Sequence, residues 1–442
     1  MKRLLTLLLC AALLLSCLTT AQAAGVTITL TASEYALHYE FDAGAQDPFV
    51  ILEYASPAEK GWMILYSADG HFEGDLTLAY SGAGGKTSVS LTSARTTGSL
   101  GKASATLPAA ADYQQPTGKS NAKVTALTLT ETPAGFHYAF DAPETDYMLL
   151  YWRSKEQTVT QPIYPDENGH YEGDVVSELT FARTQFTVQV KNGSGSTKKE
   201  ATVRKGYQAP EPVQRQEGRL SGVTVCIDAG HQENGRFVTE PIGPGLSGST
   251  SGKGGMAQGS KTNRRESIVC LEAAVLLRDE LLRQGANVVM TREDQTTFHT
   301  NIERCEIAEA GGAQIMLRLH CNNSSNRSKQ GIQVYGPLHS DYAKQVADTD
   351  TYFAMGQTLL DAMKTRVGLK LVNSTGMVHL NDNYVGNNWA KMMCFLVEMG
   401  YLSNVQEEYL LVTPTYQQWL AEGMADGIYG IAVAQGWVSA EE

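Results

Sequence analysis

The chain has 442 residues, which is too long for one ordinary domain and predicts two or three. Its net charge of −12 argues against the positively charged surface that nucleic-acid-binding proteins need. Beyond the N-terminus no apolar run is long enough to span a bilayer, so we expect neither a nucleic-acid partner nor a transmembrane helix.

The first 23 residues are predicted to be a targeting segment rather than part of the fold. Two basic residues at positions 2 and 3 precede an apolar run, and AQA at positions 21–23 follows it, which is typical of a secretory signal cleaved after Ala23. LLSC at positions 14–17 resembles a lipoprotein cleavage box, so lipidation of Cys17 is the alternative. In both cases we expect a protein of the cell wall or extracellular space, with a mature net charge of −14 once positions 2 and 3 are removed.

An internal repeat follows. HYEFDA at 38–43 recurs as HYAFDA at 137–142, and GHFEGD at 70–75 recurs as GHYEGD at 169–174, both 99 residues apart. Each copy has short alternating runs rich in Thr, Val, Tyr and Phe, separated by turn signals. We therefore expect two tandem all-β sandwich-like repeats of immunoglobulin-like size, residues 24–112 and 122–205, with the repeated aromatic residues in their cores.

The second half of the chain has a different pattern. Residues 206–219 contain two prolines and no apolar period, which predicts a semi-extended linker. Residues 220–438 alternate apolar strands with helical patterns, which predicts an α/β domain with a largely parallel sheet flanked by helices. The predicted elements are strand 223–227, helix 266–284, strands 287–292, 315–320 and 331–336, helix 355–367, strand 394–398 and helix 419–434.

Four side chains are expected at the carboxyl edge of this sheet, where ligands bind in such folds. His231 follows the first strand, His320 and Glu398 close two others, and Glu266 opens the long helix. Two histidines and one glutamate with an open fourth position form a ligand set of zinc hydrolases, and a second glutamate supplies a general base. The convergence of these residues, rather than any one of them, predicts a zinc-dependent hydrolase.

The same residues carry a resemblance to a known family. IDAGHQ, the helix that ends in LLRQGANVVMTRED, LRLHCN and VEMGYLSN are similar, in this order, to motifs of the zinc-dependent N-acetylmuramoyl-L-alanine amidases of amidase family 3. The resemblance implies that His231, Glu266 and His320 bind Zn²⁺ and that Glu398 is the catalytic residue. It also implies a substrate, the amide between the lactyl group of N-acetylmuramic acid and L-alanine in peptidoglycan. Arg318 departs from the usual Ser-Ile-His-Ala-Asn motif, so we expect altered contacts near the site.

Other functions remain open. A zinc peptidoglycan carboxypeptidase or endopeptidase would share the chemistry, although the usual His-x-x-Glu pair is absent because position 234 is Asn. A non-catalytic wall-binding protein would lack the open site. A cysteine hydrolase using His320 and Cys321 is disfavoured, because neighbouring strand residues point to opposite faces. The remaining candidates are predicted to have no role in the site. His299, His339 and His379 are expected at the surface, Glu233 is a minor ligand candidate, and the cysteines are expected to be buried free thiols.

A glycine-rich stretch, residues 235–263, connects two of the implied ligands. It begins four residues after His231 and ends three residues before Glu266. A structureless stretch of this length in a compact domain is usually functional or disordered. We expect a lid that becomes ordered over bound substrate and shields the metal site, with a tolerated surface insertion as the alternative.

Overall fold

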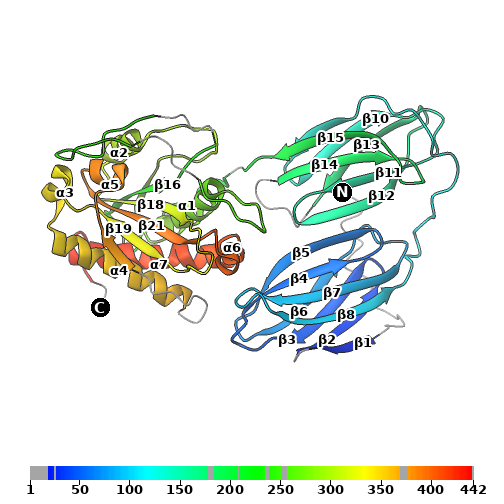
Figure 1. Ribbon diagram of the computed structural model, residues 1–442, viewed down its shortest axis with the longest axis horizontal. Helices are drawn as coiled ribbons and strands as arrows, with labels where there is room; N and C mark the ends of the chain where they lie inside the picture. The colour runs from blue at the N-terminus through cyan, green and yellow to red at the C-terminus, as the bar shows by residue number, and fades with distance from the viewer. Residues whose placement is uncertain are drawn as a thin grey trace. The chain divides into compact units, whose positions relative to one another are not determined.

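The computed structural model describes residues 18–23, 26–177, 184–207, 209–233, 238–250, 256–368 and 377–440. The chain divides into two compact units, Met1–Lys205 and Gly206–Glu442. The first is all-β and the second is α/β, which confirms the predicted N-terminal all-β region and C-terminal α/β domain (Figure 1). Among the described residues, no helix combines the length and apolar character needed to cross a membrane.

The all-β unit is built from antiparallel strands. Their bounds are β1 (Leu18–Ala23), β2 (Val26–Ser33), β3 (Ala36–Asp42), β4 (Phe49–Ala55), β5 (Glu59–Tyr66), β6 (His71–Thr77), β7 (Gly85–Ser93), β8 (Ser99–Leu107), β9 (Thr128–Thr132), β10 (Gly135–Asp141), β11 (Met148–Arg153), β12 (Gln157–Ile163), β13 (His170–Val176), β14 (Thr184–Lys191) and β15 (Thr197–Lys205). Two smaller sheets have the orders β1-β2-β3-β6 and β13-β10-β9, and a larger one has the order β15-β14-β11-β12-β5-β4-β7-β8. Strands β2 to β8 and strands β9 to β15 therefore follow the same order in their sheets.

Each half of this unit has its own hydrophobic core. In the first, the rings of Phe41 and Phe72 stack with centroids 4.9 Å apart, and in the second, Phe140 and Tyr171 stack at 4.7 Å. All four residues are buried and come from the repeated sequence segments. The prediction that the repeated aromatic residues form cores is confirmed.

The two halves meet at strands β5 and β12, which pair antiparallel with Lys60 opposite Thr158. Glu59 and Gln157 lie on either side of this pair, and each is the last residue of a turn. Ser56 donates its N–H to Glu59 O at 2.8 Å, and Ser154 donates its N–H to Gln157 O at the same distance. The pairing is thus nearly symmetrical, in the manner of an isologous contact. Gln157 Nε2 also donates to Glu59 Oε2 at 3.3 Å across it.

We expect Glu59 to make the stability of this junction depend on pH. It is 3% exposed, and burial raises the pKa of its carboxyl above the ordinary value of 4.5, although Tyr80 N and Ser81 Oγ donate hydrogen bonds to it. Because the folded state holds this proton more tightly than the unfolded chain, the stabilisation is fully present below pH 4.5 and is lost as the pH rises through the folded pKa.

We therefore expect Glu59→Gln to remove this component of the pH dependence. The measurement is the melting temperature of wild type and variant from about pH 4 to pH 8, compared as a difference at each pH. Glu53→Gln, on an exposed face of β4, is the matched control. A constant difference between wild type and Glu59→Gln across this range would contradict the prediction.

The α/β unit contains a mixed sheet between helices. Its elements are β16 (Thr224–Ala229), α1 (Glu266–Arg283), β17 (Asn287–Met290), α2 (Asn301–Ala310), β18 (Ile315–Asn322), β19 (Gln333–Gly336), α3 (Asp341–Val346), α4 (Thr349–Val367), β20 (Met377–Leu380), α5 (Val385–Trp389), β21 (Met393–Tyr401), α6 (Val405–Leu411) and α7 (Pro414–Ala434). Every predicted strand and helix has a counterpart, with α4 and α7 beginning earlier than predicted. Elements α2, α3, α5, α6 and β20 were not predicted.

The strand order of this sheet is β17-β16-β18-β21-β19-β20. The four strands β17, β16, β18 and β21 pair parallel with one another in this order. Strand β19 is antiparallel to β21 and parallel to β20. Helices α4 and α7 lie along one side of the sheet, and α2 and α5 along the other (Figure 1). Strands β16, β18 and β21 are buried over almost their whole length, so their carboxyl ends form one edge where polar side chains can gather.

The described part of the predicted linker, residues 206–207 and 209–219, forms no helix or strand. Its later residues contact α1 through hydrogen bonds. Arg278 explains the contact, because its Nη2 donates to Pro210 O at 2.9 Å and its Nε to Asp279 Oδ1 at 2.9 Å. Arg278 is the charged exception in the apolar pattern of α1 and is 3% exposed. A buried guanidinium needs such partners, so it attaches the segment to the α/β unit.

Candidate active site

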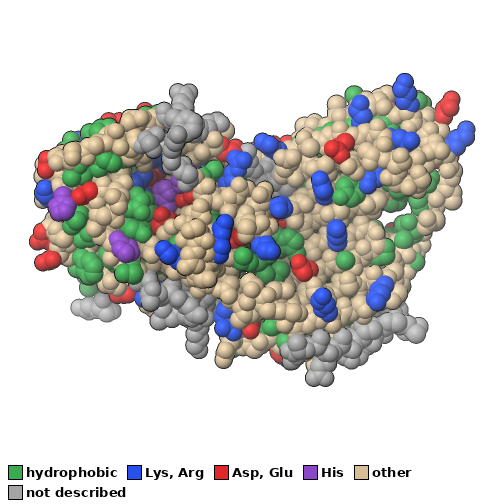
Figure 2. Space-filling model, viewed as in Figure 1, with side chains coloured by type: hydrophobic (Ala, Val, Ile, Leu, Met, Phe, Trp, Pro, Cys, Tyr) green, Lys and Arg blue, Asp and Glu red, His purple; other side chains and the backbone are tan. Residues whose placement is uncertain are grey.

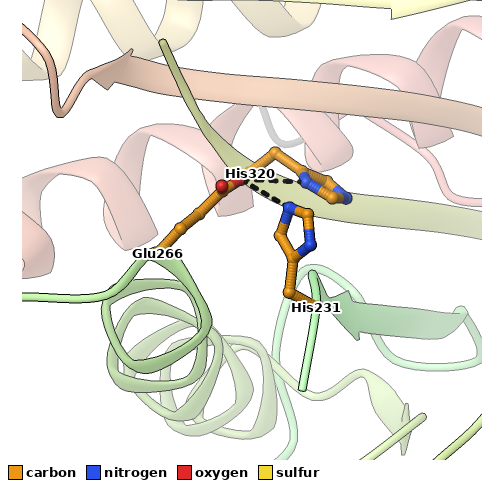
Figure 3. Close-up of side chains that lie close together, drawn as sticks. All are labelled: His231, Glu266 and His320. Carbon is orange, nitrogen blue, oxygen red and sulfur yellow. Dashed lines mark hydrogen bonds and ion pairs between the residues drawn. The ribbon is translucent and has the colours of Figure 1, made fainter. Parts of the chain in front are cut away.

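His231, Glu266 and His320 meet at the carboxyl edge of the sheet (Figure 3). His231 Nε2 lies 3.0 Å from Glu266 Oε1, and His320 Nδ1 lies 3.1 Å from the same oxygen. Their potential ligand atoms all lie within 4.8 Å of one another. Among the described residues, they are the one group of three or more His, Cys, Asp or Glu placed so that it could hold a metal ion.

The chemistry of this group fits a zinc ion. His320 Nε2 is buried without a hydrogen-bond partner among the described residues. Burial lowers the pKa of His320 to about 4, so its ring is neutral at physiological pH. Burial opposes ionisation of Glu266, but hydrogen bonds with His231 and His320 outweigh it and lower the pKa of this carboxyl. A neutral imidazole and an ionised carboxylate are the forms in which these side chains bind zinc.

The Gly-His pair at the end of β16 has a geometric reason. A Cβ on Gly230 would lie 2.4 Å from Leu319 O and 2.6 Å from the His320 ring, so only glycine allows this close approach. His231 has a φ of 57°, in the left-handed region that non-glycine residues seldom adopt. Backbone held in this region often marks a functional site, and here it turns the imidazole towards Glu266.

Glu266, the first residue of α1, is fixed by the chain around it. Its Oε2 accepts the N–H of Ala257 at 2.7 Å, and its own N–H donates to Ala257 O at 2.9 Å. Its Oε1 accepts the N–H of Cys321 at 3.0 Å. The N-terminal position on the helix also favours a negative charge.

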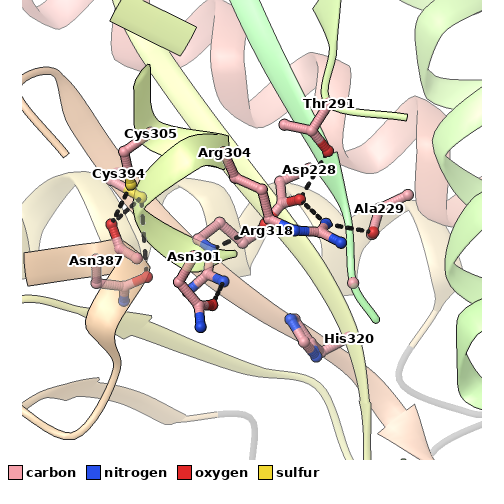
Figure 4. A network of polar contacts seen from close by, with 12 residues as sticks. Asp228, Ala229, Thr291, Asn301, Arg304, Cys305, Arg318, His320, Asn387 and Cys394 are labelled. Carbon is pink, nitrogen blue, oxygen red and sulfur yellow. Dashed lines mark hydrogen bonds and ion pairs between the residues drawn. The ribbon is translucent and has the colours of Figure 1, made fainter. Parts of the chain in front are cut away.

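A buried ionic network holds the end of β16 (Figure 4). Asp228 is fully buried and binds the guanidinium groups of Arg304 and Arg318, the latter at 3.0 Å from Nε to Oδ2. Burial alone would raise the pKa of Asp228, but these two cations lower it. Arg304 Nη1 also donates to Ala229 O at 2.9 Å, two residues before His231.

Arg318, which departs from the family motif, contacts Asp228 rather than an implied metal ligand. Its Nη2 donates to Asn301 Oδ1 at 2.6 Å. It packs against Gly386, where a Cβ would lie 2.3 Å from its Cζ. Arg318 therefore supports the backbone that carries His231.

Arg292, which sequence reasoning missed, ties the two implied ligand segments together. Its Nη2 donates at 2.8 Å both to Gly230 O, beside His231, and to Ser267 O, beside Glu266. Its Nε donates to Ala229 O at 2.8 Å. One buried guanidinium thus sets the distance between the end of β16 and the start of α1.

Glu398 lies beside His320, its partner in the parallel register of β18 and β21. Its side chain is 9% exposed, and its Oε2 has no hydrogen-bond partner among the described residues. Burial, and then the negative charge of Glu266, raises the pKa of Glu398 well above its ordinary value. A carboxyl with high proton affinity and a free oxygen is suited to move a proton.

Two glutamates of α6, also missed from the sequence, hold loops beside the site. The carboxylate of Glu408 accepts the backbone N–H groups of residues 260–262 at 2.5–2.9 Å, directly before α1. Glu407 accepts the N–H groups of Gly331 and Tyr401 at 2.8 and 2.7 Å. Burial raises the pKa of Glu407 to about 7.

The glycine-rich stretch 235–263 is only partly described, because residues 234–237 and 251–255 lie outside the described residues. The described parts contain no helix and no named strand, as expected, but other segments of the α/β unit hold them in place. Glu240 accepts the N–H of Ile302 at 2.8 Å, Trp389 Nε1 donates to Pro241 O at 2.9 Å, and Glu408 holds the end. Ordering over bound substrate stays a prediction for the rest.

We expect Glu408→Gln to lower the stability of the α/β unit by about 1–3 kcal/mol, because an amide cannot accept all of the buried N–H groups that now face a carboxylate. The measurement is the free energy of unfolding in denaturant. Glu309→Gln is the control, because Glu309 is exposed and contacts Lys391 at 2.9 Å. Equal stability of the two variants would show that the contacts of Glu408 add nothing.

The structure disfavours a cysteine hydrolase. Cys321 is 2% exposed, and burial raises the pKa of its thiol well above the ordinary value, so the nucleophilic thiolate is not available. The five cysteines of the described residues are free and buried, as predicted.

The remaining candidates lie outside the group formed by His231, Glu266 and His320. Glu233 forms an ion pair with Arg265 at 3.1 Å. His339 is exposed, as predicted, and pairs with Asp382. His299 and His379, also predicted at the surface, are half-buried and so only partly exposed. His379 stacks on a neighbouring ring because the unpredicted strand β20 places it in the sheet.

Comparison with known proteins gives the family of this unit. Residues 225–429 match the family described as N-acetylmuramoyl-L-alanine amidase. The probable cell wall amidase LytH of Staphylococcus aureus is 27% identical over 218 residues, which cover 48% of this chain and 60% of that protein. The matched part is thus less than two thirds of that relative's length.

Solved structures with the same name are also similar. The N-acetylmuramoyl-L-alanine amidase from Clostridium difficile 630 is 24% identical over 48% of this chain and 96% of its own, with a TM-score of 0.37. The catalytic domain of CwlV from Bacillus (Paenibacillus) polymyxa var. colistinus is 25% identical over 49% of this chain and 99% of its own, also with a TM-score of 0.37. On the match to residues 225–429, the α/β unit of this chain is an amidase family 3 domain, the catalytic domain of N-acetylmuramoyl-L-alanine amidases.

Proposed function

We propose that the protein is a secreted, zinc-dependent peptidoglycan hydrolase that cleaves the amide between the lactyl group of N-acetylmuramic acid and the L-alanine of the stem peptide. The observation that best supports this is the meeting of His231, Glu266 and His320 beside Glu398, inside the residues that match the amidase family. The name of the relative, a cell wall amidase, supports a wall substrate.

In this proposal His231, Glu266 and His320 hold the ion, and Glu398 moves the proton. When bound, Zn²⁺ supplies a Lewis acid that polarises the substrate carbonyl and lowers the pKa of water, so that water can lose a proton near neutral pH as it attacks the carbonyl carbon. Glu398 accepts the proton of the attacking water and then donates it to the leaving L-alanine nitrogen. Its burial supports this role, since a desolvated carboxylate binds a proton strongly.

The proposed organisation follows the predicted boundaries. In this proposal residues 1–23 are a signal peptide, with a lipid anchor at Cys17 as the alternative. Residues 1–17 lie outside the described residues, but Leu18–Ala23 form β1 and pair with β2, so the structure places the end of the predicted signal peptide in the fold. Residues 24–112 and 122–205 are tandem repeats of one sandwich-like module, 206–219 are the linker and 220–438 are the catalytic domain. The matching strand orders of the two halves support the repeats.

We expect the pair of repeats to act as a separate module, because the chain divides into compact units at Lys205. A fragment of residues 24–205 should melt in one cooperative transition, followed by circular dichroism. If it binds cell walls, binding should depend little on salt, because the acidic mature chain is not attracted to anionic wall polymers. Strong weakening of wall binding by salt would contradict this explanation.

Mass spectrometry of a peptidoglycan digest tests the proposed function. An amidase releases stem peptides that begin with a free L-alanine amine and leaves intact glycan chains. Release of a C-terminal residue would instead identify a carboxypeptidase, and cleavage within the stem an endopeptidase. No product with the zinc-loaded chain would identify a binding protein without catalysis.

A further inference from the structure

A set of half-buried polar and aromatic side chains continues the site on the side of Glu398 that faces away from His320. In the sheet register Glu398 is opposite His320 on β18 and opposite Gln333 on β19. Directly paired residues present their side chains on the same face, so these three form a row across adjacent strands. Tyr335 of β19 and His379 of β20 are paired with each other in the same way.

These side chains are held in place by one another. Gln333 Oε1 accepts a hydrogen bond from Asn322 Nδ2 at 3.0 Å and from the Tyr335 hydroxyl at 2.6 Å. The rings of Tyr335 and His379 stack with centroids 4.9 Å apart, and Tyr384 lies against Tyr335 at 5.0 Å. Pre-organised groups of this kind lose little entropy when they bind a ligand.

The set is open to a ligand rather than closed into the core. Gln333, Tyr335, His379 and Tyr384 are each half-buried. On the face shown in Figure 2, histidine side chains lie beside hydrophobic ones on the surface of the α/β unit. The partnerless, nine-tenths buried oxygen of Glu398 marks the adjoining position as one that a bound group completes.

The direction of the reaction assigns this set to one half of the substrate. The carbonyl of the scissile amide must face His231, Glu266 and His320, where the proposed positive charge is held, and the leaving nitrogen must face Glu398, which protonates it. The chain beyond that nitrogen then extends past Glu398 towards Gln333 and Tyr335. That chain is the stem peptide, whereas the glycan lies on the carbonyl side.

We propose that Gln333, Tyr335, His379 and Tyr384 form a subsite for the first residues of the stem peptide. The amide and hydroxyl groups bind the peptide backbone, and the ring faces pack against its short apolar side chains. Gln333 carries no charge, and burial raises the pKa of the Tyr335 and Tyr384 hydroxyls, so we expect peptide binding there to depend on shape and hydrogen bonds. This inference rests on the proposed amidase function and adds the part of the substrate that is recognised.

Product inhibition of the zinc-loaded full chain tests the subsite, with a soluble muropeptide as substrate. The two inhibitors are a free stem tripeptide that begins with L-alanine and a free N-acetylmuramic acid-containing disaccharide. The variants are Tyr335→Phe and Gln333→Met, which remove hydrogen bonds but keep side-chain volume. Tyr342→Phe is the matched control, because Tyr342 contacts Trp389 and Lys391 instead.

In both variants we expect the inhibition constant of the tripeptide to rise about five- to tenfold, the effect of one lost hydrogen bond. KM should rise with it, kcat should change less than about twofold, and disaccharide inhibition should stay unchanged. Unchanged tripeptide inhibition in both variants, or weaker disaccharide inhibition alone, would overturn the subsite. The melting temperatures of the variants check that they remain folded. Absence of amidase turnover by wild type would refute the proposed function itself, whereas wild-type turnover with unaltered variants would refute the subsite alone.

Discussion

Glu398→Gln should lower turnover by about 10²–10⁴-fold, the usual contribution of a general acid–base group, while the protein keeps its metal. Glutamine has nearly the same volume and cannot accept the proton of the attacking water. Glu398 lies outside the group that could hold the ion, so its loss removes no ligand. The variant also removes a carboxyl whose ionisation is opposed by burial, so we expect that its melting temperature does not fall.

The measurement is kcat on a soluble muropeptide together with the zinc content of the purified protein. Glu309→Gln, on the exposed surface, is the control for the substitution itself. Near wild-type turnover in the Glu398 variant would remove its catalytic role. Loss of zinc would instead make Glu398 a ligand.

His231→Ala and His320→Ala should each abolish stable zinc binding and, with it, hydrolysis. Loss of a partner behind a ligand already costs about 10–100-fold in metal affinity, so loss of a direct ligand should cost more. Both imidazoles now contact the same oxygen of Glu266, and removing either leaves the carboxylate with one histidine.

Elemental analysis after dialysis measures the effect, with melting temperature in added zinc as a second readout, because an ion bound only to the folded state stabilises it. His339→Ala is the matched control, since that histidine is exposed and pairs with Asp382. Unchanged zinc content in either site variant would reject that residue as a ligand.

The positions of the candidate ligands could be predicted because they follow from local signals. A buried strand that ends in Gly-His, and another that ends in His, place side chains at one sheet edge wherever the strands are parallel neighbours. The structure places His231, Glu266 and His320 together in this way. The start of helix α2 could also have been predicted from the sequence, since Thr300 and Glu303 form a capping box that is visible as Thr-x-x-Glu.

The supporting residues could not be predicted in the same way. Glu408 binds backbone 146–148 residues away, and nothing in its own neighbourhood indicates which loop it holds. Asp228 and Arg318 were charged residues inside apolar strands, which signals a buried partner, but the sequence does not say that the partners are each other and Arg304. Arg292 donates its hydrogen bonds to backbone carbonyl oxygens. Because every residue has such an oxygen, the sequence does not indicate which ones Arg292 contacts.

The nearly symmetrical pairing of β5 with β12 also bears on how the N-terminal unit can be divided. A strand at the border of a sheet offers unpaired N–H and C=O groups that recruit other strands, and here each half satisfies those groups of the other. A single half cut out of the chain would expose them. Because Glu59 and Gln157 occupy the same turn position, the natural substitute for the missing half is a second copy of the same half, joined β5 to β5. The tandem pair is therefore the smallest piece of this unit in which β5 and β12 keep the pairing they have in the chain, and we expect an isolated half to self-associate.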